Sequence, residues 1–207
     1  MDRGPPGPLM IMTEAKGWHS RGYLPHFDSP ETVQFVTFRL ADSLPKAVVE
    51  GLRLADDGIQ RIDRELDGGL GECWLRSPAI ASLVQDSLFH SDGQRYRLLA
   101  WCLMPNHVHV VMDMLEGKAS LGAIVRSWKS FTARRANEQL GRSGAFWHAD
   151  YFDRYMRDED QLNRTIEYVE QNPVKAGLVS DAADWPWGSA YFRNDRFHER
   201  AWRPAVQ

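Results

Sequence analysis

The chain has 207 residues, 43% of them hydrophobic, which is enough for one domain with a packed core. Its formal net charge of -3 means that the chain is not basic overall, so net charge does not indicate DNA binding. Its two cysteines are far apart in the sequence, which excludes a disulfide scaffold or a cysteine zinc site. No apolar run approaches the roughly 20 residues of a membrane span, and the apolar core of residues 1–12 is too short for a secretion signal, so we expect a cytoplasmic protein.

The first predicted elements are one strand and two helices. Residues 32–41, TVQFVTFRLA, are rich in β-branched and aromatic side chains, which is typical of a strand. Apolar residues then recur at helical spacing between residues 44 and 66. Ser77 as N-cap and Pro78 at the first helical position predict the start of a second helix.

Two further strands follow, and the second carries a pair of histidines. Residues 95–104, RYRLLAWCLM, and residues 107–114, HVHVVMDM, flank a Pro-Asn turn, which predicts antiparallel pairing. Successive side chains of a strand point to opposite faces, so His107 and His109 share one face and the intervening Val108 packs on the other.

The rest of the chain predicts two helices with a loop and a short strand between them. Ser120 caps a long helix that ends near Gly141. Asp158, with Gln161 three residues later, forms a capping box that begins the last helix. Pro173 should end it, because the residue before a proline disfavours helical conformation. The apolar positions of the long helix are expected to share one buried face: Leu121, Ile124, Val125, Trp128 and Phe131.

This order of elements predicts an α+β domain with one antiparallel sheet and helices packed on it. The domain should span residues 22–195. Residues 1–21, which include several prolines and glycines, are expected to form a flexible N-terminal tail, and residues 196–207 a C-terminal tail.

A basic segment coincides with the long helix. Between Lys118 and Arg142, six basic residues stand against one acid, Glu138. A solvated helix face explains such a segment as well as a phosphate-binding surface does. If the surface binds DNA, the residues expected to contact phosphates are Arg126, Lys129, Arg134 and Arg135.

The two histidines at i and i+2 can both reach one divalent cation through imidazole nitrogens. By itself the pair is also compatible with a structural role. The last helix favours a site: at about 100° per residue, Tyr168 and Asn172 lie side by side on the flank of its buried stripe. Tyr168 can then act as a nucleophile and the Asn172 carbonyl oxygen as a third ligand, whereas the alternative is a tyrosine with a packed ring and a solvated hydroxyl.

Six segments together resemble a known family: FVTFRLADSLP, MPNHVHVV, KSFTARRAN, RSGAFWHADYFDRYMRDE, YVEQNPVKAGLV and WPWGSAYF. From about Gly22 to Phe192 the chain is similar to the REP-associated tyrosine transposases, which are single-tyrosine HUH transposases. One departure is Gly188, where the family pattern leads us to expect serine.

The resemblance implies a ferredoxin-like, HUH nuclease-like domain that cleaves and transfers single-stranded DNA at hairpin repeats. It implies that His107, His109 and Asn172 bind Mg²⁺ or Mn²⁺, and that Tyr168 forms a 5′-phosphotyrosine intermediate. Single-stranded or hairpin DNA would be the partner, and we expect a monomer rather than a homodimer.

Two other classes compete with this interpretation. A histidine-triad nucleotide hydrolase requires a third alternating histidine, but Val111 stands at that position. A catalytically inactive DNA-binding regulator derived from a transposase is the stronger alternative. Such a regulator could lose the tyrosine or a histidine, and all four expected groups are present in this chain.

Overall fold

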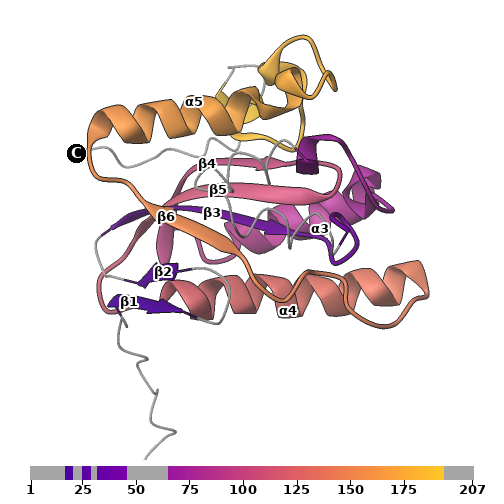
Figure 1. The fold of residues 1–207 in the computed structure, drawn as a ribbon, viewed down its shortest axis with the longest axis horizontal. Helices are drawn as coiled ribbons and strands as arrows, with labels where there is room; N and C mark the ends of the chain where they lie inside the picture. Colours follow the sequence, from indigo (N-terminus) through magenta and orange to yellow (C-terminus); the bar gives the residue numbers. More distant parts are fainter. Residues whose placement is uncertain (1–16, 21–24, 29–31, 46–64, 194–207) are drawn as a thin grey trace, which may run out of the picture.

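The structure is a computed structural model that describes residues 17–20, 25–28, 32–45 and 65–193 (Figure 1). The helix expected over residues 44–66 lies almost wholly outside these ranges, as do most of the two expected tails. Within the expected N-terminal tail, Gly17–Ser20 forms strand β1, which pairs antiparallel with β2, Pro25–Asp28.

The main sheet contains four antiparallel strands in the order β4-β5-β3-β6. Three of them match the predicted strands: β3 is Val33–Arg39, β4 is Tyr96–Leu103 and β5 is His107–Met114. The fourth, β6, is Phe152–Tyr155 and lies in the segment predicted as loop and short strand. A bulge between Leu98 and Ala100 shifts the register of β4 against β5.

Three longer helices lie within the described residues. Helix α3, Pro78–Phe89, connects β3 with β4, and helix α4, Leu121–Leu140, connects β5 with β6. Helix α5, Glu159–Lys175, follows β6. The resulting β-α-β-β-α-β connectivity with this strand order is the ferredoxin-like arrangement, so the predicted α+β fold is confirmed. Shorter helical segments are η1 (Trp74–Arg76), η2 (Ala182–Asp184) and α6 (Ser189–Arg193).

The sheet separates two layers of helices. Helices α3 and α4 cover one face, and α5 lies across the other (Figure 1). The larger core lies between the sheet and α3 and α4, and contains Val108, Val110 and Met112 of β5. A smaller cluster lies under α5, where Val111 and Cys102 of the sheet meet Val169. The histidine pair therefore lies on the side of the sheet that α5 covers.

The predicted helix boundaries hold at four of the five ends that the sequence specified, and the start of α3 at Pro78 after Ser77 is one of them. Ser120 accepts a hydrogen bond from the Ala123 N–H, and Gly141 ends α4 with a left-handed φ of 60°. Asp158 accepts from the Gln161 N–H at 2.7 Å. The expected stop at Pro173 is wrong, because α5 continues to Lys175. A proline removes only its own N–H bond and already has a helical φ, so the last turn can form around it.

The expectation that Phe131 is buried is also wrong, because its side chain is 45% exposed. In the second half of α4 the buried side passes through Thr132 and Ala136 instead. Trp147 causes this shift: its indole N–H donates to Thr132 Oγ1 at 2.9 Å, which draws Thr132 toward the core. Phe131 is thereby turned outward.

Candidate active site

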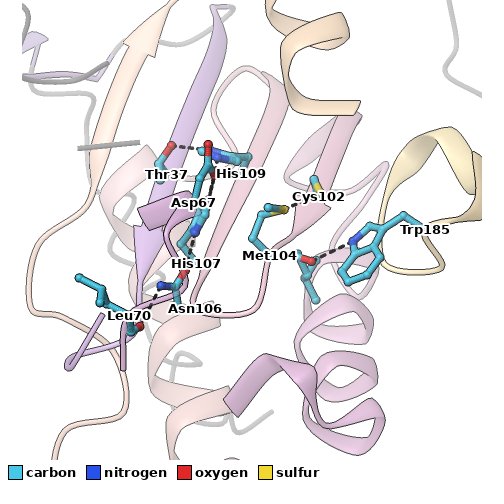
Figure 2. A network of polar contacts seen from close by, with 10 residues as sticks. Thr37, Asp67, Leu70, Cys102, Met104, Asn106, His107, His109 and Trp185 are labelled. Carbon is cyan, nitrogen blue, oxygen red and sulfur yellow. Dashed lines mark hydrogen bonds and ion pairs between the residues drawn. The ribbon is translucent and has the colours of Figure 1, made fainter. Parts of the chain in front are cut away.

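The histidine pair lies at the beginning of β5, under helix α5. Both side chains are 0% exposed, and the two Nε2 atoms are 3.0 Å apart. The prediction that His107 and His109 share a face is confirmed by this contact. Figure 2 shows the two rings pointing toward each other between Thr37 and Asn106.

Asn106 fixes the proton position on His107. Its Nδ2 donates to the Leu70 carbonyl at 3.0 Å, so Oδ1 is the atom that faces His107 Nδ1, at 2.7 Å (Figure 2). A carboxamide oxygen only accepts, and the proton of the neutral imidazole must therefore be on Nδ1. The Nε2 atom of His107 then presents a lone pair. Proton positions follow here from the hydrogen-bond network.

Thr37 is compatible with either neutral tautomer of His109. Its Oγ1 lies 2.8 Å from His109 Nδ1, and a hydroxyl can donate or accept. Without a cation, His109 Nε2 carries the proton and donates to His107 Nε2, while Thr37 donates to Nδ1. With the proton on Nδ1 instead, Thr37 accepts, and both Nε2 lone pairs are free for a common ligand.

Burial keeps both imidazoles uncharged. It lowers the pKa of His107 well below its ordinary value, with a further contribution from neighbouring His109, and lowers the pKa of His109 to about 3. Neutral imidazole is the form that binds a metal ion, so at neutral pH neither histidine must lose a charge before binding one.

Helix α5 brings Tyr168 and Asn172 over the histidines. The Tyr168 ring packs edge-on against His109, with ring centroids 5.7 Å apart, and against Phe35 at 6.3 Å. The side chain is half-buried. Lys175 places its Nζ 4.8 Å from the centroid of the same ring. The structure therefore places Tyr168 against the histidine pair, with Asn172 one helical turn further along α5.

Asn172 is buried with its amide group unpartnered. The residue is 1% exposed, and neither Oδ1 nor Nδ2 has a hydrogen-bond partner in the described part of the chain. A buried carboxamide without partners costs on the order of 1–3 kcal/mol. Its carbonyl oxygen suits a hard divalent cation. Within the described ranges, no three His, Cys, Asp or Glu side chains are arranged to hold a metal.

Asp67 is a site residue that the sequence did not indicate. Its Oδ1 lies 3.9 Å from His107 Nε2, on the side of the ring away from Asn106 (Figure 2). Burial raises the pKa of Asp67 to about 6, and Lys175 opposes the shift. No motif surrounds this residue in the sequence. By contrast Asp113, on the histidine face of β5, lies opposite Arg97 in an ion pair at 3.8 Å and not at the site.

The basic residues of α4 do not lie beside the histidines. Helix α4 packs on the opposite face of the sheet (Figure 1). Lys129 holds the following loop through the Ala149 carbonyl at 2.8 Å, and Arg135 forms an exposed ion pair with Glu138. Arg126 and Arg134 are exposed.

Comparison with known proteins agrees with this architecture. Residues 88–172 match the family described as "Transposase IS200 like". The resemblance inferred from the sequence is confirmed. A putative REP-associated tyrosine transposase of Haemophilus influenzae is 26% identical over 103 residues, which are 45% of this chain and 58% of that protein. The REP-associated tyrosine transposase of Escherichia coli is 24% identical over 95 residues, which are 45% of this chain and 54% of that protein.

The chain thus spans little more than half the length of these curated relatives. A solved structure of a REP-associated tyrosine transposase bound to a REP hairpin superimposes with a TM-score of 0.57 at 16% identity, covering 88% of this chain and 91% of that one. This similarity establishes the fold. None of the helices in the described residues is both long and apolar enough to cross a membrane.

Proposed function

We propose that this chain is a DNA transposase that cleaves and rejoins single-stranded DNA through a covalent 5′-phosphotyrosine on Tyr168. The observation that carries the proposal is the arrangement of the site. Two buried imidazoles converge through Nε2 at 3.0 Å, directly under a helix that presents a tyrosine and an unpartnered carboxamide. A hydrogen bond between the two imidazoles would explain their approach, but a purely structural role does not explain the buried Asn172 amide that has no partner among the described residues.

The donor set fits a divalent cation. His107 Nε2, His109 Nε2 and Asn172 Oδ1 are the atoms that would hold it, which leaves room for water and a phosphate oxygen. When bound, Mg²⁺ or Mn²⁺ supplies Lewis-acid polarisation of the phosphodiester. The two imidazoles favour Mn²⁺ over Mg²⁺, since Mg²⁺ prefers oxygen ligands.

The chain's own residues supply the nucleophile and position it. The Tyr168 oxygen forms a bond to phosphorus, the bond from phosphorus to the 3′ oxygen breaks, and the tyrosine proton is lost as the 3′-hydroxyl gains one. The Tyr168 ring is held by Phe35 and His109, so its hydroxyl approaches from a fixed direction. Lys175, above the ring, stabilises negative charge that develops nearby. Because the ester bond is retained, a 3′-hydroxyl can reverse the step and join strands without ATP.

The substrate we propose is single-stranded DNA next to a hairpin. The solved structure of similar fold contains a REP hairpin, and a flexible single strand can pass in line with the tyrosine. The four cations of α4, on the other face, would contact phosphates of the same DNA only if it extends around the edge of the domain.

Covalent capture of DNA tests the chemistry. Palindromic repeats near the gene, made as labelled hairpins with single-stranded flanks, are incubated with the protein and Mn²⁺ or Mg²⁺ and separated on a denaturing gel. We expect a protein–DNA adduct whose 5′-phosphate maps to Tyr168, and no adduct with Tyr168→Phe, which keeps the ring packing. Tyr191→Phe, in α6, is a matched control and should form the adduct. Robust cleavage by Tyr168→Phe, or an adduct on another residue, would contradict the proposal.

A further inference from the structure

Arg39, the last residue of β3, lies on the same face of the sheet as the histidine pair. In the pairing of β3 with β5, Arg39 is opposite His107 and Thr37 is opposite His109. Thr37 contacts His109 directly, and alternate residues of a strand share a face. Arg39 is therefore the neighbour of the histidine pair on the next strand.

His148 lies on the other side of Arg39. Its backbone N–H donates to the Arg39 carbonyl at 2.9 Å, next to a bridge between Leu40 and Trp147. Leu40 and Trp147 are both buried in the core under α3 and α4. By alternation, Arg39 and His148 face the opposite side, toward the histidine pair. The sheet thus carries His148, Arg39 and His107 in a row across its strands.

The Arg39 guanidinium is buried and, in the part of the chain that the structure describes, has no counter-charge. The residue is 9% exposed, and in the described residues it donates only from Nη1, to Ser43 Oγ at 3.2 Å and weakly to the Leu40 carbonyl at 3.5 Å. None of the carboxylates described in the structure is within ion-pair distance of it. Burial lowers the pKa of Arg39 to about 10, so the group is still charged at neutral pH. Buried charges are normally paired, so this arrangement calls for an anion.

His148 provides a neutral donor beside that charge. Its Nδ1 accepts from the Asp150 N–H at 3.3 Å, so the neutral ring carries its proton on Nε2. Burial lowers the pKa of His148, and the charges of Arg39 and Lys129 lower it further, which keeps the ring neutral.

We propose that Arg39 and His148 form a binding subsite for one backbone phosphate of the DNA strand, beside the histidine pair. The proposal rests on the proposed function and specifies how the strand is held. A guanidinium binds phosphate oxygens with two parallel N–H groups, and an imidazole N–H adds a third donor. Neighbouring strands of a sheet are about 4.8 Å apart. Arg39 therefore receives a phosphate next to the scissile one and fixes the register of the strand over Tyr168.

The experiment measures binding of oligo(dT) in EDTA, by fluorescence anisotropy, over a series of salt concentrations. EDTA removes metal-dependent cleavage, so the result is independent of the chemistry on Tyr168. Loss of one phosphate contact lowers the slope of log K against log salt by about 0.7 for single strands. We expect this decrease for Arg39→Gln. The same change at Arg97, an exposed residue near the far end of the sheet, is the matched control and should keep the wild-type slope.

Two further variants separate charge from geometry. Arg39→Lys keeps the charge and should retain the slope while binding several-fold more weakly, because a lysine lacks the planar fork. His148→Ala removes a neutral donor and should weaken binding without changing the slope. Thermal unfolding will show whether Arg39→Gln folds. If it does not fold, the binding of Arg39→Lys and His148→Ala still tests the subsite.

The outcomes distinguish the subsite from the proposed function. Wild-type slope and affinity in Arg39→Gln, or wild-type affinity in both Arg39→Lys and His148→Ala, would overturn the subsite alone. A decrease in slope together with the absence of any Tyr168 adduct would overturn the chemistry and support the subsite. If the wild-type protein binds neither oligo(dT) nor the hairpins with single-stranded flanks, the subsite and the proposed DNA function are both wrong.

Discussion

The histidine pair has hydrogen-bond partners that determine which nitrogen is free. Asn106 requires the His107 proton on Nδ1, whereas Thr37 allows His109 to hold its proton on either nitrogen. The sequence predicted the pair and the face that it occupies, because strand alternation is a local rule. It did not predict the role of Asn106, which we interpreted only as part of a turn. That role depends on Leu70, a residue distant in the sequence.

The first prediction concerns the two imidazoles. His107→Ala and His109→Ala should abolish divalent-dependent cleavage and leave hairpin binding within a few-fold, because phosphate contacts supply most of the affinity. Mn²⁺ should raise the thermal midpoint of the wild-type protein and not that of either variant, since a ligand stabilises only the state that binds it. His90→Ala, at an exposed position after α3, is the control. Cleavage at the wild-type rate by either site variant would contradict the metal assignment.

The second prediction concerns Thr37. Thr37→Val removes the hydroxyl that accepts from His109 Nδ1 when both Nε2 atoms face a cation. We expect Mn²⁺ affinity, measured by titration calorimetry, to fall about 10- to 100-fold, the usual effect of losing a partner of a metal-binding histidine. Thr37→Ser keeps the hydroxyl and should bind Mn²⁺ nearly as tightly as the wild type. Equal affinity in all three proteins would show that His109 needs no such partner.

At the scale of elements, helix positions were harder to predict than helix ends. Capping residues act locally, so Ser120 and Asp158 marked their helices correctly. Which face of the sheet a helix covers depends on the crossover, and nothing within α4 indicates that it lies opposite α5. The same holds for Phe131, whose exposure follows from the docking of Trp147 on Thr132. Asp67 is near the site for an equally non-local reason, since its segment is joined to the Pro-Asn turn through Leu70.

The third prediction concerns two arginines of helix α4. Reversing Arg134 and Arg135 to Glu should weaken single-strand binding and lower the salt slope by about 1.4 if both contact phosphates. The position of α4 on the opposite face provides a direct alternative, in which its arginines are simply solvated. Oligo(dT) anisotropy over a salt series separates these cases, with Arg97→Glu as a control of equal charge change per site. An unchanged slope would assign this helix face to solvation.

At the scale of the whole molecule, burial of the site makes folding stability depend on pH. In the metal-free protein, the pKa of His107 and of His109 is lowered by burial, that of His109 from 6.5 to about 3. Below pH 6.5 the unfolded chain therefore binds protons that the folded chain does not. The free energy of unfolding should decrease as the pH falls, by up to about 1.4 kcal/mol per pH unit for each histidine.

Asp67 acts in the opposite direction. Its pKa is raised from 3.8 to about 6, so between these values the folded protein holds a proton that the unfolded chain releases. Between about pH 6 and pH 4, the effect of Asp67 on the free energy of unfolding cancels the effect of one histidine. Below about pH 4 this cancellation ends, and the free energy of unfolding should again fall more steeply as the pH decreases. Urea unfolding in EDTA, from pH 7 to pH 3.5, measures the effect. Replacing both histidines with Gln should remove most of the decrease, and in Asp67→Asn the decrease between pH 6 and pH 4 should become steeper. If the histidine variant retains the wild-type pH dependence, the buried imidazoles are not its source, and the acid sensitivity arises elsewhere in the domain.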